Sequence, residues 1–456
     1  MSIVEPCCLL PVDRCPHHSA TGNASLATGN ASLATGNASP ATGNASLATP
    51  IDFVAPPFAG HLFPLLELAR GLRDRGVARP RILSTSDVAP TIRLCDLEPV
   101  DLLPGRADEV WAIANTSSRT GRNPLRLYRQ FRANMALMAD VAARLRATWS
   151  EQRPSLVIAD FTVPVAGFIA RELGIPWWTS MPSPCALETR TGTPSYLGGW
   201  SPSHSLLGRT RDAVGRNVIR TFKRTVAFVF RDALHTMHMK DVYRDDGTEA
   251  AYSDECILGL GMREFEFARD WPSSFHFAGP LVAAPPFAHN APHFAPDKRA
   301  ILVTLGTHLP WARDNAVALI EHVAAAMPDC EFHFAHGRPG HDAREVRANV
   351  IHHDFLPYDQ HLEKFSAAIV HGGTGITYAC INAGVPMLVW PHDYDQFDHA
   401  ARIVANGIGL RLRPTQIARD LRQLLDDPAI HSRVAAMQHA SRAYDAVDFV
   451  ARRLPS

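Results

Sequence analysis

The sequence has few cysteines, no excess charge of either sign and no long apolar run. Its eight cysteines are scattered over 456 residues without a CxxC pair, which excludes a disulfide scaffold and favours a reducing cytoplasm. The formal net charge is zero, so the basic face that nucleic acid binding normally requires is missing. No apolar stretch approaches the length of a membrane span. We therefore expect a cytoplasmic globular enzyme whose partners do not include nucleic acid.

The chain is too long for a single hydrophobic core, so two folded domains are expected. A tail at residues 1–50 precedes them, in which the heptapeptide ATGNASL recurs from Ala20. A period of seven also suggests a coiled coil, but each repeat offers only one branched apolar residue beside glycine and asparagine. Small polar repeats bury too little surface to offset chain entropy, which predicts a disordered, low-complexity tail.

The first domain is predicted at residues 51–281. The stretch IDFVA from Ile51 is typical of a buried strand, and an amphipathic helix follows from Leu62 to Gly76. Strands and helices then alternate, with a strand at 81–86, a long helix at 125–149, a strand ending at Asp160, a helix at 163–173 and another strand after it. This alternation predicts a parallel, doubly wound α/β sheet.

The second domain is predicted at residues 298–456, after a linker at 282–297 that is rich in proline and alanine and has no period. The domain opens with the strand ILVTLGT and alternates in the same way. Two helices close the chain, one at 415–426 and one from His431 to about Arg452. The last of these helices can return to the first domain.

One glycine-rich turn in the second domain has the properties of a phosphate site. An apolar run ends at Val370, and His371, Gly372 and Gly373 follow where a helix can begin. Glycines let backbone N–H groups approach an anion, and the start of a helix adds unpaired donors and the positive end of a dipole. A second strand at 386–390 ends in a polar loop. Open α/β sheets bind ligands at such carboxyl ends of parallel strands.

The spacing of these residues resembles the nucleotide-sugar signature of the glycosyltransferases of family 1, which have the GT-B fold. The matching residues are His371, Gly373-Thr374-Gly375, Gly384-Val385-Pro386, Pro391 and Asp395-Gln396. The resemblance extends over residues 51–454 and implies two Rossmann-like domains that face each other across a cleft. It also implies that His371 and the amides near Thr374 and Gly375 hold a diphosphate. Asp395 and Gln396 would then hold the hydroxyls of the donor sugar.

The same resemblance implies a catalytic base in the first domain. His61 lies in a Gly-His-x-x-Pro segment that matches the family's amino-terminal motif, and Asp160 matches the aspartate that orients this histidine. A histidine titrates near neutral pH, so it can take the acceptor's proton while a carboxylate holds its other ring nitrogen. On residue type alone, the alternatives are a structural histidine and an aspartate that caps a strand end.

Two further positions match donor contacts of the family. Thr307 follows a strand, at the place where relatives use serine or threonine against phosphate; a plain turn residue is the alternative. Phe355 lies about where the family stacks an aromatic ring on the base; a core phenylalanine is the alternative.

One departure from the family leaves the nucleotide open. The family often has a glutamate for the ribose hydroxyls where this chain has Ala379, and a thymidine nucleotide would lose less by this change than a uridine nucleotide. Asp393-Tyr394-Asp395 matches a DxD metal motif, but it lies where GT-B relatives carry Asp-Gln against the sugar. We therefore expect a UDP- or dTDP-linked sugar as co-substrate, and neither a cofactor nor a metal.

The predicted activity is inverting transfer of a hexose or 6-deoxyhexose to a hydroxyl of a small lipophilic acceptor, of the natural product, lipid or carotenoid type. Aromatic residues in the acceptor half suit such an acceptor and suit an ordinary core equally well, among them Trp177, Trp178, Tyr196, Trp200, Phe228 and Phe230. The alternatives are a glycolipid rhamnosyltransferase at the membrane surface, a catalytically silent partner protein with the same fold, and a nucleotide-sugar epimerase, in which the Gly-His-x-x-Pro segment is not expected.

Basic and apolar residues are interleaved at residues 209–232. Three interpretations remain for the amphipathic helix that this pattern predicts: it lies on an anionic membrane, it covers the acceptor pocket, or it packs on its domain with the arginines toward solvent. Peripheral contact with the inner face of the membrane is therefore the alternative to a purely cytoplasmic location.

Overall fold

The structure is a computed structural model that describes residues 49–114, 124–236, 239, 241–287, 289, 291–307, 309–338 and 344–455. The described residues belong to one compact unit, Ser46–Ser456. Residues 1–48 of the predicted tail lie outside the described part, so its disorder stays a prediction. The first strand begins at Thr49, two residues before the predicted strand start at Ile51, and Thr49 N donates to Val77 O at 3.2 Å.

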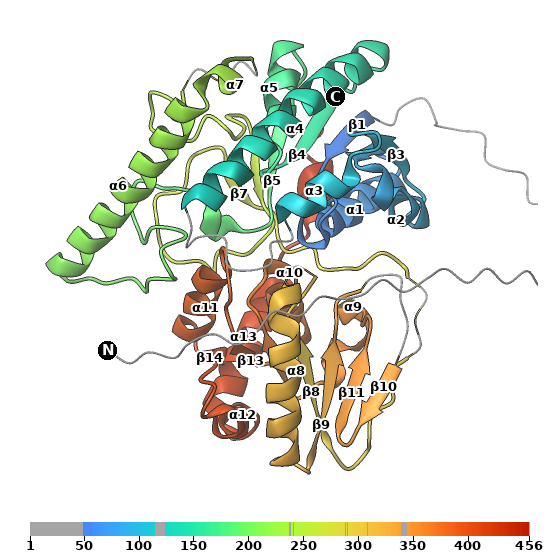
Figure 1. The fold of residues 1–456 in the computed structure, drawn as a ribbon, viewed down its shortest axis with the longest axis vertical. Coiled ribbons are helices and arrows are strands. Elements are labelled where there is room, and N and C mark those ends of the chain that lie inside the picture. The colour runs from blue at the N-terminus through green and yellow to red at the C-terminus, as the bar shows by residue number, and fades with distance from the viewer. Residues whose placement is uncertain are drawn as a thin grey trace, which may run out of the picture. The chain divides into compact units, whose positions relative to one another are not determined.

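Among the described residues, seven strands form the first sheet (Figure 1). They are β1 (Thr49–Val54), β2 (Ala78–Ser84), β3 (Glu98–Asp101), β4 (Leu156–Asp160), β5 (Trp177–Met181), β6 (Ile257–Gly259) and β7 (Phe275–Phe277). Their order is β3-β2-β1-β4-β5-β6-β7, and every neighbouring pair is parallel. The winding reverses between β1 and β4, so a ligand crevice is expected at the carboxyl ends of these two strands.

A second sheet of seven strands is built from the later part of the described chain. Its strands are β8 (Arg299–Thr304), β9 (Cys330–Ala335), β10 (Arg344–Arg347), β11 (Val350–His353), β12 (Ala367–Val370), β13 (Met387–Val389) and β14 (Gly409–Arg411). Their order is β10-β11-β9-β8-β12-β13-β14, and all pairs are parallel except β10 with β11. Here the winding reverses between β8 and β12. The predicted α/β class with two doubly wound sheets is confirmed, with an antiparallel edge strand that the sequence pattern did not predict.

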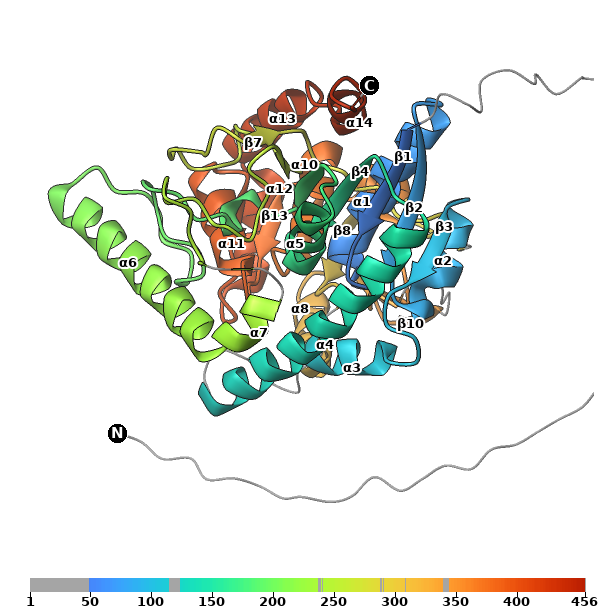
Figure 2. The same cartoon turned by 90° about the horizontal axis from the view of Figure 1, so that it is seen from above.

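Helices alternate with these strands along the chain (Figure 1). They are α1 (Ala59–Asp74), α2 (Ala89–Leu94), α3 (Ala107–Ala114), α4 (Pro124–Glu151), α5 (Pro164–Glu172), α6 (Leu206–Val229), α7 (Arg231–Thr236), α8 (Pro310–Ala325), α9 (Tyr358–His361), α10 (Thr374–Ala383), α11 (Gln396–Ala405), α12 (Ile417–Asp426), α13 (Pro428–Ser441) and α14 (Ala446–Ala451), with short 3-10 turns at Ser86–Val88, Pro184–Ala186 and Leu362–Lys364. The long helix α6 continues into α7, and α7 lies beside α4 (Figure 2). Within the described part of the chain, no helix combines the length and the apolar character that crossing a membrane would require.

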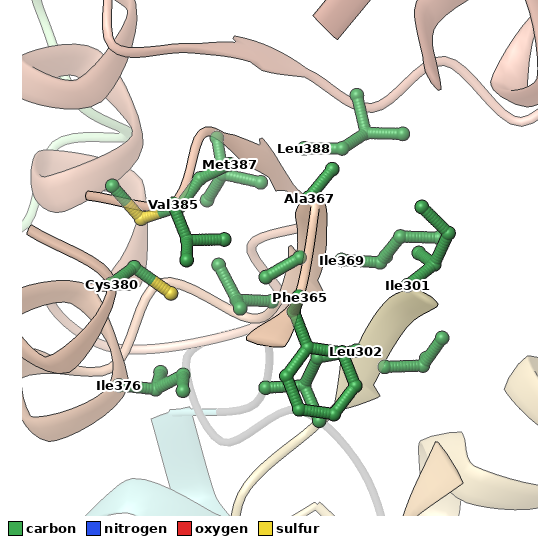
Figure 3. Close-up of a cluster of buried hydrophobic side chains, with 14 of the residues drawn as sticks. Ile301, Leu302, Phe365, Ala367, Ile369, Ile376, Cys380, Val385, Met387 and Leu388 are labelled. Carbon is green, nitrogen blue, oxygen red and sulfur yellow. The ribbon is translucent and has the colours of Figure 1, made fainter. Parts of the chain in front are cut away.

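An apolar core between the second sheet and α10 holds the predicted phosphate turn in place. Side chains of β8, β12 and β13 meet Ile376 and Cys380 of α10 in one cluster (Figure 3). All four residues of β12 are buried, as expected of a central parallel strand. The core therefore fixes the start of α10 against the end of β12, where His371 begins the turn.

The prediction of one helix from His431 to about Arg452 is wrong, because α13 and α14 are separate. Asp445 ends the gap between them and accepts a hydrogen bond from Asp448 N at 2.8 Å, which caps the start of α14. The helix then packs on α1, where a Cβ at Gly71 would lie 2.6 Å from Val447 Cγ2. A glycine at position 71 therefore lets the end of the chain lie close to α1.

The predicted domain bounds of 51–281 and 298–456 stay predictions. Two segments cross those bounds in the packing. Met262 and Phe265, from the first predicted domain, belong to the core of the second sheet. Ala446 and Val450, from the second, belong to the core around β1. The two halves are thus tied together at both places.

A buried chain of hydrogen bonds links two histidines on β9 and β11. His353 Nε2 lies 3.0 Å from His333 Nδ1, and His333 Nε2 lies 3.2 Å from Glu331 Oε1. The carboxylate can only accept, so His333 donates to it through Nε2 and accepts from His353 through Nδ1. Both rings are neutral in this arrangement. Burial lowers the pKa of His353 to about 3, and repulsion from Arg344 and from the neighbouring histidines when they are protonated acts in the same direction.

The structure predicts that acid destabilises the protein through His353. Because the pKa is lower in the folded than in the unfolded state, the contribution to stability is full above about pH 6.5 and is lost as the pH falls toward 3. One titrating proton changes the free energy of unfolding by about 1.4 kcal/mol per pH unit within that window. Urea unfolding from pH 7.5 to about 4.5 should show a shallower loss for His353→Gln, which keeps the donor but does not titrate. Equal slopes for the two proteins would assign the acid sensitivity to other groups.

Candidate functional site

A cavity of about 590 Å³ lies where both sheets reverse their winding. Its lining includes residues that follow β1 and β4 of the first sheet and β8 and β12 of the second. Nine of the ten predicted site residues line it, namely His61, Thr307, Phe355, His371, Gly373, Thr374, Gly375, Asp395 and Gln396. Asp160 is the exception. It is buried behind His61, with 1% of its surface exposed.

His61 and Asp160 form a hydrogen-bonded pair. His61 lies in the first turn of α1, and Asp160 is the last residue of the neighbouring parallel strand β4. His61 Nδ1 is 3.1 Å from each carboxylate oxygen of Asp160. Since a carboxylate accepts, Nδ1 carries the hydrogen, and Nε2 is left as the basic nitrogen of a ring that lines the cavity. This is the arrangement of a general base with a positioning carboxylate.

The environment of His61 tunes its basicity. Burial alone would lower the pKa of His61, but the charge of Asp160, its hydrogen bond and the charge of Asp395 together raise the pKa above its usual 6.5. Asp160 is itself held, because Thr162 N donates to Oδ1 at 2.9 Å and Thr162 Oγ1 donates to the same atom at 2.5 Å. Asp160 thus serves both as a strand-end cap and as the partner of the histidine.

Two glycines make room for the ring of His371. A Cβ at Gly306, after β8, would lie 2.7 Å from His371 Cε1, and Gly306 also has a φ of +70°. A Cβ at Gly373 would overlap His371 Nε2. Gly375, by contrast, has no atom within 4 Å of such a Cβ. The imidazole is therefore held between two backbone segments at the ends of β8 and β12.

Gly373→Ala should weaken nucleotide binding, because the added methyl group displaces the His371 ring. We expect a loss of about tenfold or more in affinity for a nucleoside diphosphate, in line with one lost charge-assisted hydrogen bond. Isothermal titration measures this loss. Gly375→Ala is the matched variant for folding, and its melting temperature should stay that of the wild type. A Gly373→Ala protein that binds as the wild type does would show that the ring position is unimportant.

The turn after β12 ends at a helix start suited to an anion. Gly373 is the N-cap of α10, and the first helical hydrogen bond runs from Thr377 N to Gly373 O at 3.0 Å. The amides of Thr374, Gly375 and Ile376 therefore precede that bond and have no carbonyl of α10 as partner. With the helix dipole, they favour negative charge beside His371.

Ser183 bridges the two halves of the cavity, and sequence reasoning missed it. It follows β5 and is 4% exposed. Its hydroxyl donates to Asp395 Oδ2 at 2.5 Å and also contacts the hydroxyl of Thr374. A signal was present, because Ser183 comes just after a parallel strand and so lies at the ligand-binding edge of the sheet.

Gln396 is fixed by the loop that precedes it. Its Oε1 accepts from His392 N at 2.9 Å and from Asp393 N at 3.1 Å. The amide nitrogen of Gln396 is then the group that can donate to a ligand hydroxyl. Asp395 offers carboxylate oxygens beside it, so the pair presents both a donor and acceptors to one part of the cavity.

Thr307 and Phe355 lie at the cavity wall as half-buried residues. Arg313 Nη2 donates to Thr307 O at 3.1 Å, which fixes the turn. The Phe355 ring packs edge-on against Phe287, with centroids 5.4 Å apart. Ala379 is different: it is 3% exposed, belongs to the core of the second sheet and does not line the cavity.

One part of the cavity wall is mainly apolar. Its side chains come from α3, α4 and the loops after β1 and β4, and they include Phe58, Val110, Ile113, Leu137, Met138, Val141 and Phe161, with Gln130 and Asn134 as polar neighbours. Of the aromatic residues suggested for the acceptor, Tyr196 lines the cavity. Trp177 and Trp178 are core residues instead, 3% and 7% exposed. The cavity can accommodate a lipophilic molecule next to His61.

One residue of the acidic triplet Asp393-Tyr394-Asp395 belongs to a group of possible metal ligands. Among the residues that the structure describes, the group that could hold an ion is Cys185, Asp395 and His399, with ligand atoms within 4.8 Å of one another. Asp393 is not a member of it. His399 Nδ1 donates to Gly372 O at 2.7 Å, and Asp395 already accepts from Ser183. Asp395 is thus a member of this group and also the residue directly before Gln396.

Part of the chain matches a known domain, and most of it is similar to characterised proteins. Residues 319–454 match the model of the C-terminal domain of erythromycin biosynthesis protein CIII-like proteins. The chain is 26% identical over 406 residues to the zeaxanthin glucosyltransferase of Pseudescherichia vulneris, a match that spans 84% of this chain and 91% of that protein.

Two solved structures have a similar fold. The glycotransferase of kitacinnamycin has a TM-score of 0.68 and 24% identity, over 90% of this chain and 100% of the other. The glycosyltransferase VinC in complex with dTDP has a TM-score of 0.60 and 19% identity, over 89% of this chain and 99% of the other. At these identities the likeness establishes the fold.

Proposed function

Since this chain is a glycosyltransferase of family 1 with the GT-B fold, we propose that it transfers a sugar, with inversion, from a nucleotide diphosphate sugar to a hydroxyl of a small lipophilic acceptor. Two sites meet in one cavity, and this observation supports the proposal most directly. His61 with Asp160 enters it from the first sheet, and the anion-binding turn at His371 enters it from the second.

The proposed reaction is a single displacement. His61 Nε2 takes the proton of the acceptor hydroxyl as its oxygen attacks the anomeric carbon, and the bond from that carbon to the diphosphate oxygen breaks. The imidazolium that forms is stabilised by the adjacent Asp160 carboxylate. Attack from the face opposite the diphosphate inverts the anomeric centre.

The second half of the chain would hold the donor without a metal. His371, the amides of Gly373 to Gly375 and the hydroxyl of Thr307 surround the place for the diphosphate, and developing negative charge there is stabilised by donors fixed in advance. Asp395 and Gln396 would hold the hydroxyls of a hexose or 6-deoxyhexose. Phe355 at the cavity wall would stack on the base.

The nucleotide that we propose is uridine or thymidine diphosphate. A dTDP complex is known for VinC, whose fold is similar. Ala379 offers no carboxylate that could accept a hydrogen bond from a ribose 2′-hydroxyl. A thymidine nucleotide has no 2′-hydroxyl, so it would lose less by this change than a uridine nucleotide. The similar zeaxanthin glucosyltransferase supports an acceptor of the carotenoid or lipid type, and the apolar cavity wall is consistent with one. We also propose peripheral contact with a membrane surface. We do not expect the protein to bind nucleic acid.

Calorimetric titration with UDP, dTDP and GDP, with and without EDTA, tests the donor site. Metal-independent binding of UDP or dTDP is the expected result. An assay of sugar transfer from the matching nucleotide sugar to zeaxanthin and other hydroxylated lipophiles then tests the acceptor class. Binding of none of the nucleotides would favour a catalytically silent partner protein, and binding only with metal would favour the DxD hypothesis.

A further inference from the structure

The outer face of α6 carries exposed apolar side chains. Seven large hydrophobic residues of this helix have 44 to 85% of their surface exposed, namely Leu206, Leu207, Val214, Val218, Phe222, Phe228 and Val229. They are half of the large hydrophobic residues exposed in the described part of the chain, so the exposure is concentrated on one helix. A concentration of this kind marks an interaction surface, whereas scattered single residues do not.

The apolar side of α6 faces away from the protein, which is the reverse of the usual orientation of a surface helix. Leu207, Val214, Val218 and Phe222 are spaced by seven and four residues, which puts them on one side.

The opposite side of α6 is polar and contacts the rest of the protein. Arg220 Nε lies 2.5 Å from Glu188 Oε1, and Lys223 pairs with Glu188 and Glu249. Arg216 donates to Gly192 O. A surface helix normally buries its apolar side. The prediction that the arginines point toward solvent is wrong for Arg216 and Arg220, which contact the protein as Lys223 does.

The remaining exposed charge of α6 is positive. Arg209, Arg211 and Arg224 are exposed, and Arg211 pairs with the acidic residue of the helix, Asp212, which is 6% exposed. Apolar side chains flanked by arginine, without exposed acidic residues, are typical of a helix that lies on an anionic lipid surface. Pairing with a second α6 fits less well, because an antiparallel pair centred between Asn217 and Val218 would set Arg211 level with the other copy's Arg224.

The exposed surface continues toward the cavity along α4. Tyr128 of α4 stacks on Phe230 with ring centroids 5.6 Å apart, and the Phe131 ring lies 6.4 Å from that of Phe222. The same helix lines the cavity from Gln130 to Val141. Phe131 and Leu137 are about 9 Å apart along the helix axis. Figure 2 shows α4 meeting the α6–α7 segment at one side of the protein.

We infer that the outer face of α6 docks the enzyme on an anionic lipid membrane, from which a lipophilic acceptor reaches the cavity along α4. The docking follows from α6 itself; the passage of the acceptor rests on the proposed function. Burial of the exposed apolar side chains of α6 in the membrane interface supplies most of the affinity. The arginines add an attraction to lipid phosphates, and salt weakens this attraction.

Vesicle sedimentation with the full chain tests the docking. Wild type should bind phosphatidylcholine vesicles that contain phosphatidylglycerol, and bind less at high salt or without the anionic lipid. Val218→Glu with Phe222→Glu should reduce binding tenfold or more. The matched control is Val346→Glu, which places a charge on an apolar residue that is 58% exposed on β10, and it should bind as the wild type does.

Three results would overturn this inference. They are equal vesicle binding by the α6 variant, no vesicle binding by the wild type, and a wild-type dimer in sedimentation velocity that the α6 variant converts to monomer, which would make a second copy the partner. Nucleotide titration on all proteins separates the two proposals. Intact nucleotide binding without vesicle binding refutes the docking alone, and vesicle binding without nucleotide binding refutes the donor site alone.

Discussion

The His61→Ala enzyme should bind nucleotide as tightly as the wild type and transfer sugar roughly 10²- to 10⁴-fold more slowly, the usual contribution of general base catalysis. The alanine removes the nitrogen that would accept the acceptor's proton. It leaves the anion-binding turn intact, because that turn belongs to the second sheet. Single-turnover transfer from the nucleotide sugar, with nucleotide affinity measured by calorimetry, separates the two effects. A small loss of rate would remove His61 from the proposed role.

Asp160→Asn provides the companion measurement to His61→Ala. The Asp160 carboxylate is one of the groups that raise the pKa of His61. The neutral histidine is the active form, so wild-type kcat/KM should rise with pH through a pKa above 6.5. Removal of the charge lowers the pKa of His61, so the rise should move to lower pH while the maximal rate falls. A packing role for Asp160 would lower the rate without shifting the profile.

His371→Ala should weaken the binding of UDP or dTDP by roughly 10- to 100-fold, the range for a lost hydrogen bond to a charged group. The ring lies against Gly306 and Gly373, so its removal leaves a gap at the proposed diphosphate position that no neighbouring side chain replaces directly. The binding of the unphosphorylated nucleoside should change little, because the loss is confined to the phosphates. Calorimetry with nucleoside and diphosphate on the same protein measures both.

His322→Ala is the matched control for His371→Ala. His322 is an exposed histidine on α8 and does not line the cavity, so this variant should bind both ligands as the wild type does. Equal losses for nucleoside and diphosphate in His371→Ala would mean that the cavity had deformed as a whole. In that case His371 would have a structural role rather than a contact with phosphate.

Much of the first half of the site follows from local pattern. The strand before His61 is apolar and ends at a loop, and the helix after it has an apolar side, so a histidine at the start of that helix must lie at the edge of the sheet. Asp160 ends an apolar strand for the same reason. Their approach to 3.1 Å depends on β1 and β4 being neighbours, which the sequence order of the strands alone does not require.

The contacts made by Ser183 and α6 show where local pattern ends. Ser183 and Asp395 are 212 positions apart, and no periodicity links them. The side of α6 that faces the protein was decided by Glu188 and Glu249, which are distant acidic partners that satisfy its basic residues. An amphipathic pattern identifies two sides of a helix but not which of them meets the protein.

By itself, the sequence determined the α/β class, the places where strands end, the glycines that free backbone donors, and the residues that match the family signature. These depend on apolar spacing and backbone freedom, which act over a few residues. Only the tertiary structure decided that His61 meets Asp160, that Ser183 joins Asp395, that Ala379 is a core residue and that the apolar side of α6 is exposed. Those outcomes depend on which distant elements pack together, because burial and charge pairing are properties of the assembled chain.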